Sequence, residues 1–447
     1  MFDPALVLYV LIKRIILSQL ALKKVCTKVN NKAEKSMSES YKPLFNRTYL
    51  KAILWIVAIV IVLLSAKGNN STDYISIQKN NSGPVYFVDL DDAANLQLQL
   101  IFPLGAAITQ DQQLLHQLTL DIAEQQLALF ETEPKFQPLK LRSNILHHED
   151  RLTIKLTIPK TELDNHQLIA DLPQAVIHQL HNANTGIDLE ARWNRLEAAQ
   201  YLQRKDPEKQ LLKAFGEQIS SSGIHLLQRF NDYFRNSFNI AALSVTLDGP
   251  QSPLIAQAIA NRLPGYQNSI SLPEPIVAAT TLRLSPVGNT PYSLAGRALP
   301  GRQQTNFAQE LLAIQTIQAL LQQSGLQFRL VWKSLDKRGY LAMMLHGQNT
   351  PADLQQLQQQ LQPMTTKLDT ALIEATRSKI IERFRQQMAQ QDSQLSLLNS
   401  VAFYQLPLDY MAQFEATLNQ VDSQSVAKLV TDYLDTDQLH FIYLPAL

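Results

Sequence analysis

The stretch GLQFRLVWKSLDKRGYLAMMLHG (residues 325–347) decides the fold. Apolar and polar residues alternate on both sides of a turn at residues 336–339, which predicts two half-buried strands. The preceding segment, FAQELLAIQTIQALLQQ (residues 307–323), has the apolar spacing of a helix. The following segment, TPADLQQLQQQLQPM (residues 350–364), has the same spacing. The sequence therefore predicts a unit of helix, strand pair and helix.

The same order of elements occurs about 190 residues earlier in the chain. A helical pattern covers residues 111–130. It is followed by KLRSNILHHEDRLTIKLTIP (residues 140–159), which reads as two strands around a turn at residues 148–150. A second helical pattern follows at residues 161–180. The chain therefore contains an internal duplication on the scale of a domain.

The duplication predicts an α+β protein with two tandem homologous domains, at residues 85–270 and 280–447. Each domain is expected to be an antiparallel sheet with helices packed on one side. The Pro- and Thr-rich stretch between the two ranges is expected to connect them.

Composition excludes several classes of function. The chain has 447 residues, of which 45% are hydrophobic and 18% are charged, which is typical of a packed globular protein. Its formal net charge is +1, from 40 Lys and Arg against 39 Asp and Glu, so no basic surplus indicates binding to nucleic acid. Cys26 is the single cysteine, so neither an intrachain disulfide nor a zinc site built from several cysteines can form.

The N-terminal part of the sequence predicts a membrane anchor. Residues 1–51 are rich in Lys and Arg, and residues 52–67 form an apolar run that ends in a lysine. This order predicts a transmembrane signal anchor with its N-terminus in the cytoplasm. Residues 68–84 are polar and read as a linker. Met37 begins a sequence typical of a signal-anchor protein, so we interpret residues 1–36 as a mis-assigned gene start.

The order of elements over residues 85–447 resembles that of the pitrilysin/insulinase family of zinc peptidases. Gly105 follows the first strong strand pattern, as in the family, and GLQF at residues 325–328 is similar to the family's G-L-x-Y turn. NIAALSVTLDGP (residues 239–250) resembles the strand before the last helix of the first domain. The helices and final strand of residues 371–447 are similar to the family's closing region.

The resemblance implies a zinc signature, H-x-x-E-H, on the first helix, in which two His bind zinc and the Glu is the general base. Counted from Gly105 with the family's spacing, the signature falls on LTLDI. Leu118 and Ile122 take the two His positions and Asp121 takes that of the base. His116 does not supply a shifted signature, because no His follows it four residues later.

Three further positions complete the comparison with the family signature. Glu197, with Glu190 earlier on the same predicted helix, falls near the family's third zinc ligand. Leu321 and Phe328 stand where active members carry an Arg and a Tyr that polarise the substrate. Since the zinc ligands and this pair are both absent, the resemblance implies a non-catalytic member without a metal or other cofactor.

The sequence therefore predicts a single-pass inner-membrane protein of a Gram-negative bacterium, with its main domains in the periplasm. The resemblance implies that it pairs with an active pitrilysin-like subunit, or with a second copy, and that it holds a peptide or an unfolded polypeptide.

Two alternatives remain open from the sequence. One is an active zinc metallopeptidase with a displaced site, built from His116, Asp121, Glu124 and Glu197. The other is an envelope scaffold or assembly protein that never binds a peptide.

Overall fold

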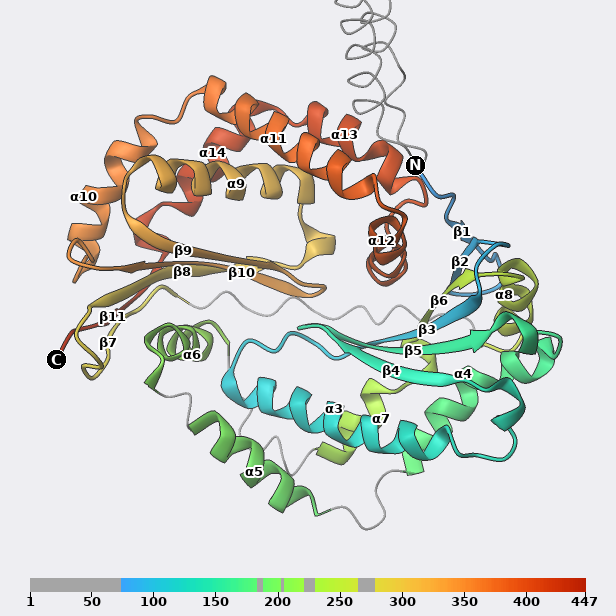
Figure 1. Cartoon of the computed structure of the whole chain (residues 1–447). Helices are drawn as coiled ribbons and strands as arrows, with labels where there is room; N and C mark the ends of the chain where they lie inside the picture. Colours follow the sequence, from blue (N-terminus) through green and yellow to red (C-terminus); the bar gives the residue numbers. More distant parts are fainter. Residues whose placement is uncertain (1–73, 183–187, 202–204, 221–229, 264–277) are drawn as a thin grey trace, which may run out of the picture. The chain divides into compact units, whose positions relative to one another are not determined.

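The computed structural model describes residues 74–182, 188–201, 205–220, 230–263 and 278–447 (Figure 1). Both β-sheets belong to one compact unit, Thr72–Leu447. The predicted basic segment (residues 1–51), the predicted anchor (residues 52–67) and Cys26 lie outside the described residues. Every helix within the described ranges is too short or too polar to cross a membrane.

The first sheet has six strands in the order β1-β2-β6-β3-β5-β4. Their bounds are β1 (Gln78–Lys79), β2 (Val85–Asp89), β6 (Ser244–Gly249), β3 (Asn95–Pro103), β5 (Arg151–Pro159) and β4 (Arg142–His147). The alternating pattern of β3 turns Leu96, Leu98 and Leu100 to one face of the sheet, where all three are fully buried. β1 lies within the segment predicted as a linker and pairs with β2.

The second sheet repeats five of the six strands of the first and has no counterpart of β1 among the described residues. Its order is β7-β11-β8-β10-β9. The bounds are β7 (Thr281–Arg283), β11 (His440–Leu444), β8 (Tyr292–Pro300), β10 (Arg338–His346) and β9 (Gln327–Ser334). These five strands take the places of β2, β6, β3, β5 and β4, with the same senses of pairing. The predicted α+β class and its duplication are confirmed.

The prediction of purely antiparallel sheets is wrong. β2 pairs with β6 in parallel, and β7 pairs with β11 in parallel. In each half the two paired strands lie near the start and at the end of the chain segment that forms the sheet, and many residues and several helices separate them. Such a long connection allows two neighbouring strands to run in the same direction, which a short hairpin does not.

The helices of each half bury one face of that half's own sheet. In the first half, α3 (Gln110–Phe130), α4 (His166–His181), α7 (Phe230–Ser237) and α8 (Ser252–Ala260) contribute to this core. In the second half, α9 (Phe307–Gln323), α10 (Leu354–Thr365), α11 (Thr370–Met388), α13 (Tyr410–Gln420) and α14 (Ser423–Tyr433) do so. α3 starts at a capping box, in which Thr109 and Gln112 satisfy each other's backbone N–H groups.

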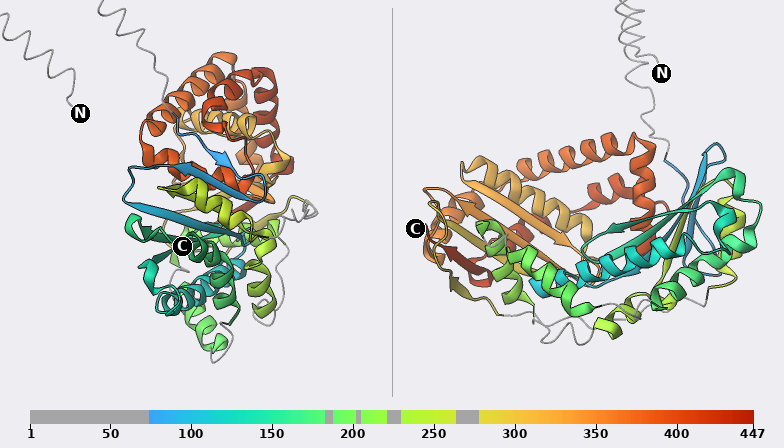
Figure 2. Two further views of the ribbon diagram at one scale, coloured as in Figure 1. Left: turned by 90° about the vertical axis from the view of Figure 1, so that its right-hand side faces the viewer. Right: turned by 60° about the horizontal axis from the view of Figure 1, so that its bottom comes forward.

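The two halves also exchange a helix, which corrects the prediction of helices on one side only. α6 (Pro207–Ile219) belongs to the first half but packs on the second sheet, against β8 and β11 (Figures 1 and 2). α12 (Gln391–Tyr404) belongs to the second half but packs on β2 and β6 of the first sheet. Gly296 of β8 makes room for this, because a Cβ there would come within 2.8 Å of the Phe215 ring of α6.

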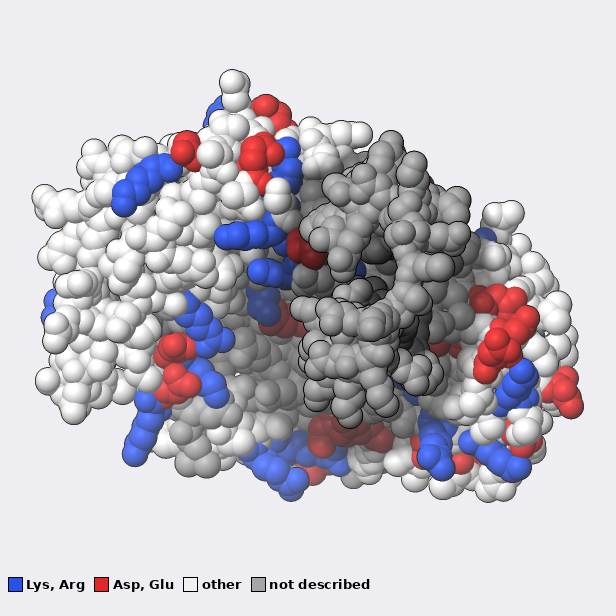
Figure 3. Space-filling view, turned by 45° about the horizontal axis from the view of Figure 1, so that its top comes forward, with Lys and Arg blue, Asp and Glu red and all other residues white. Residues whose placement is uncertain are grey.

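The remaining described helix of the first half, α5 (Leu189–Tyr201), packs against α3. On the face that Figure 3 shows, most of the described surface is uncharged, and Lys and Arg side chains lie near Asp and Glu. The described part of that face therefore lacks the continuous basic area that a nucleic-acid-binding surface needs.

Candidate functional site

A cleft of about 480 Å³ opens where the two halves meet. The first half contributes the turn between β4 and β5, and the predicted turn at residues 148–150 is confirmed there. The second half contributes the end of β9, the start of α9 and the end of α12. We call this the junction cleft, and its lining residues are His147, His148, Glu149, Asp150, Arg151, Arg302, Phe307, Trp332, Lys333, Ser334, Leu335 and Tyr404.

Asp150 is the centre of the polar network in the junction cleft, and its residue is only 2% exposed. Its Oδ1 accepts a hydrogen bond from Arg151 Nη1 at 3.1 Å. Its Oδ2 accepts one from the Tyr404 hydroxyl at 2.9 Å and one from the Asp336 backbone N–H at 3.1 Å. One buried carboxylate therefore ties the β4–β5 turn to α12 and to the turn after β9.

The buried groups of the network have shifted pKa values. Burial, followed by the charge of Asp150, raises the pKa of Tyr404 to about 12, so its hydroxyl remains a donor at neutral pH. Burial also raises the pKa of Asp336, and the charge of Asp150 adds to this shift.

Three cationic side chains line the junction cleft, and two of them have carboxylate partners. Arg151 is paired with Asp150, and Lys333 Nζ lies 2.7 Å from Glu149 Oε1 at the rim. Arg302 instead lies between two aromatic rings, with its guanidinium carbon 3.8 Å from the Phe307 centroid and 4.4 Å from that of Tyr404.

The positions predicted for the zinc signature lie elsewhere, on α3. Leu118 and Ile122 are 0% and 1% exposed and belong to the apolar core of the first half. Asp121 lies on the outer face of α3, where its Oδ2 accepts a hydrogen bond from Arg192 Nη1 of α5 at 2.6 Å. Neither Leu nor Ile can bind a metal, so a zinc ion does not fit at these positions.

His116, Glu124 and Glu197 do not converge on one point. His116 is buried, whereas Glu124 on α3 and Glu197 on α5 are exposed. Over residues 74–447, leaving out the gaps that are not described, no group of three or more His, Cys, Asp or Glu side chains could hold a metal ion.

His116 instead packs among rings. Its centroid lies 5.7 Å from that of His147 and 6.3 Å from that of Tyr233. Burial, followed by the nearby His147, lowers the pKa of His116 to about 4, so the imidazole is neutral at neutral pH. Its Nδ1 is buried and has no hydrogen-bond partner among the described residues.

Comparison with known proteins rests on structure, since no family model and no curated protein matches the sequence. The peptidase M16 inactive domain from Pseudomonas fluorescens aligns over 83% of this chain and 98% of its own length, with a TM-score of 0.59 and 13% sequence identity. This chain has the M16 peptidase fold. At this identity the likeness establishes the fold, and the predicted resemblance to pitrilysin-like peptidases is confirmed at that level.

Two further solved structures align with most of this chain. The ferredoxin protease FusC, in complex with Arabidopsis ferredoxin, aligns over 84% of this chain but 46% of its own length (TM-score 0.52, 13% identity). A chain of complex III2 from Candida albicans aligns over 84% of this chain and 96% of its own length (TM-score 0.54, 11% identity).

Within the M16 fold, the remaining predicted positions lie in the second half. Leu321, at the position expected for an Arg, is 1% exposed on α9 and belongs to the core of that half. Phe328, at the position expected for a Tyr, packs on the same core from β9. Both side chains therefore contribute to packing and offer no polar group to a substrate.

The sequence did not predict the junction cleft. Arg151, Arg302 and Tyr404 come from three segments separated by more than a hundred residues each, and no short motif joins them. The one local signal was the run of polar residues in the β4–β5 turn. That signal could not reveal what the turn contacts.

Proposed function

We propose that this chain is a non-catalytic protein of the M16 fold that binds a peptide or an unfolded polypeptide. We further propose that it works as the companion of an active subunit of the same fold, without a metal or other cofactor of its own. A pair with a second copy of this chain is the other form of the same proposal.

The observation that carries this proposal is the burial of Leu118 and Ile122 in the core. Zinc peptidases with the H-x-x-E-H signature need two imidazoles at these positions. Leu and Ile carry no atom that can bind zinc, so no change of rotamer gives either of them a ligand role. In the second half, Leu321 and Phe328 likewise pack on the core and offer no polar group to a substrate.

The companion role is supported by the lengths of the similar structures. This chain aligns with only 46% of the ferredoxin protease FusC, so that protein contains a further part of about the same size. The likeness to a chain of complex III2 supports the same role, because that chain is part of an assembly. We propose that this chain likewise meets its second half as a separate subunit.

We also propose the location. The apolar run at residues 52–67 follows a basic segment, which favours a single-pass anchor in the inner membrane with residues 74–447 in the periplasm. A peptidase subunit with an intact signature in the same membrane would be the expected partner.

The test uses the full chain, purified in detergent without chelator. We expect a zinc content near zero by elemental analysis and no cleavage of unfolded polypeptide. We also expect that pull-down from native membranes brings down a subunit carrying H-x-x-E-H. About one zinc per chain, together with chelator-sensitive cleavage, would instead establish the displaced peptidase site.

A further inference from the structure

The junction cleft contains a cation, Arg302, that forms no ion pair with a carboxylate among the described residues. Its side chain contacts the rings of Phe307 and Tyr404 and hydrogen-bonds with Tyr410, and the buried Glu310 carboxylate acts on it only from beyond ion-pair distance. Contact with two rings restricts the guanidinium and shields it in part from water. The charge is therefore held in place and only its edge remains for polar contacts.

The neighbouring carboxylates are already engaged elsewhere. Arg151 and Lys333 each pair with one carboxylate of the cleft, and the Glu310 carboxylate accepts hydrogen bonds from Trp332 Nε1 and the Thr305 hydroxyl, each at 3.0 Å. Phe307 is the first residue of α9, and the amino end of a helix adds a partial positive charge. Arg302 Nε, Arg151 Nε and Ser334 Oγ are buried around the cleft, and none has a hydrogen-bond partner among the described residues.

We propose that the junction cleft binds a carboxylate, and that this carboxylate is the C-terminus of a bound peptide. A planar guanidinium recognises a carboxylate through two parallel hydrogen bonds. Phe307 and Trp332 supply an apolar wall beside Arg302 for the last side chain of the peptide. The volume of about 480 Å³ lies within the usual range of small-ligand pockets, about 300–1,000 Å³.

This proposal deepens the proposed peptide binding and rests on it only for the source of the carboxylate. Inorganic phosphate also offers a guanidinium two acceptor oxygens, so it reports on the anion site without any peptide. Phosphate therefore separates a failure of the site from a failure of the proposed function.

The experiment measures binding to the full chain in detergent at neutral pH by fluorescence anisotropy. The probes are two fluorescein-labelled apolar hexapeptides of one sequence, one with a free C-terminal carboxylate and one with a C-terminal amide. Inorganic phosphate is the competitor, and its own binding is measured by calorimetry. We expect the carboxylate peptide to bind about tenfold or more tightly than the amide, and phosphate to displace it.

Two substitutions that each remove one positive charge test whether the carboxylate preference comes from the cleft. Arg302→Gln should remove the preference for the carboxylate and the binding of phosphate. Arg383→Gln removes one cation from the exposed surface of α11, and it should leave both unchanged. Arg302→Lys keeps the charge but not the planar fork, so we expect it to recover only part of the preference. Thermal unfolding of each variant shows that it is folded.

The possible results are distinct. Phosphate binding that is lost in Arg302→Gln, with no binding of either peptide, would retain the anion site but overturn the peptide C-terminus as its ligand and the proposed peptide binding. Equal binding of the two peptides, unaffected by Arg302→Gln, would overturn the anion site and retain peptide binding. Identical behaviour of Arg302→Gln and Arg383→Gln towards phosphate would also overturn the site.

Discussion

Leu118, which the resemblance places at a zinc-ligand position, is part of the apolar core. It lies on α3 with no exposed surface, in the apolar cluster between that helix and the first sheet. The substitution Leu118→His would bury an imidazole without a partner and remove apolar contacts. We expect the free energy of unfolding to fall by about 3 kcal/mol, without any gain of zinc.

Leu129 offers a matched control on the same helix, because it is 54% exposed. Leu129→His should change the free energy of unfolding by less than about 0.5 kcal/mol. Urea unfolding followed by circular dichroism compares the two variants with the natural chain. If Leu118→His were as stable as Leu129→His, position 118 could not be the core position described above.

Asp248 predicts a dependence of stability on pH. It lies on the same face of β6 as Thr246, whose hydroxyl bonds to Asn399 of α12 at 2.7 Å. Burial raises the pKa of Asp248 from 3.8 to about 6, although Lys155 and a hydrogen bond from Gln99 oppose the shift.

The sign of the effect follows from the two pKa values. The folded chain takes up the proton below about pH 6 and the unfolded chain only near 3.8, so this group stabilises the fold as pH falls between them. Asp248→Asn is neutral throughout, and we expect it to be about 2 kcal/mol more stable than the natural chain at neutral pH.

The advantage of Asp248→Asn should shrink as pH falls towards about 4. Urea unfolding of both chains across this range measures it. An Asn variant less stable than the natural chain at neutral pH would mean that the charged carboxylate makes contacts that outweigh its burial.

Among single side chains, the sequence predicted what is local. Leu118, Ile122 and Leu321 are apolar, and their burial follows from the helical spacing of the apolar residues around them. The hydrogen bond from Gln99 to Asp248 and the contact of Arg302 with the Tyr404 ring each join residues more than a hundred positions apart. No sequence period carries that information.

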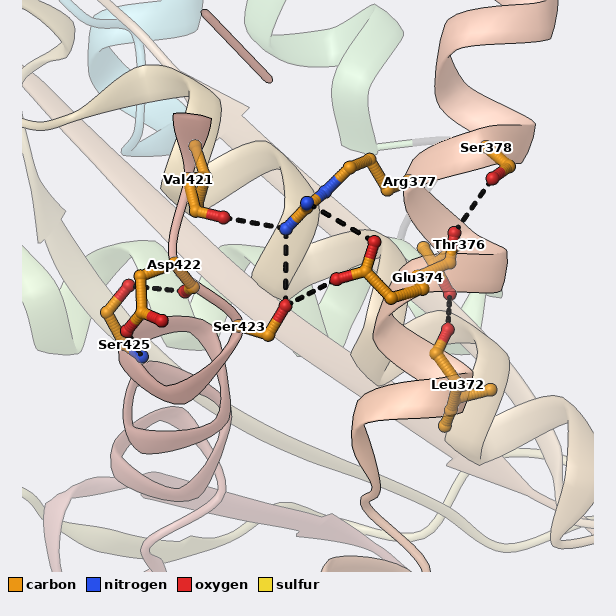
Figure 4. Close-up of polar contacts among 9 residues, drawn as sticks. All are labelled: Leu372, Glu374, Thr376, Arg377, Ser378, Val421, Asp422, Ser423 and Ser425. Carbon is orange, nitrogen blue, oxygen red and sulfur yellow. Dashed lines mark hydrogen bonds and ion pairs between the residues drawn. The ribbon is translucent and has the colours of Figure 1, made fainter. Parts of the chain in front are cut away.

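The corner between α13 and α14 is held by a side chain of α11 (Figure 4). Arg377 Nη2 donates a hydrogen bond to the Val421 carbonyl at 2.7 Å, where α13 ends, and lies 3.3 Å from the Ser423 hydroxyl, where α14 begins. Glu374 lies 3.2 Å from Arg377 Nη1 and accepts a hydrogen bond from Ser423 at 2.6 Å. Three helices therefore meet at one nearly buried guanidinium.

Removing this guanidinium should cost more than removing one on the surface of the same helix. Arg377→Gln leaves a helix-terminal carbonyl and part of a carboxylate without donors, and we expect a loss of about 2 kcal/mol. Arg385→Gln breaks an exposed pair with Glu415 and should cost less than about 1 kcal/mol. Thermal unfolding compares them, and equal losses would show that the corner is held by apolar packing alone.

Strands and helices were the best predicted features, for a physical reason. Apolar residues recur every two positions in a half-buried strand and about every 3.6 positions in an amphipathic helix. This spacing shows which side of the element is buried, whatever its place in the fold. The parallel pairs β2–β6 and β7–β11 could not be read in this way, since either sense of pairing buries the same face. The exchange of α6 and α12 was missed because an amphipathic helix does not specify which sheet it covers.

The exchanged helices make the two halves dependent on each other. Phe215 and Leu211 of α6 cover an apolar face of the second sheet that includes Leu294 and Ile442. α12 covers part of the first sheet with Leu398 and Val401, against Tyr86 and Ile101. Each half separated from the other would therefore expose apolar surface on its sheet and on its transferred helix.

Dividing the chain tests this dependence. When residues 1–277 and residues 278–447 are expressed as two separate chains, we expect each alone to aggregate or to bind a hydrophobic dye. When they are expressed together, we expect them to purify as a stable one-to-one complex, because both exchanged helices regain their sheets.

Phe215→Glu in the first piece places a charge against Gly296 of β8 and should prevent the complex. Lys213→Glu on the same helix, at a more exposed position, should not. If each piece were soluble, folded and monomeric alone, the exchanged helices would contribute too little to bind the halves, and the junction cleft would be free to open.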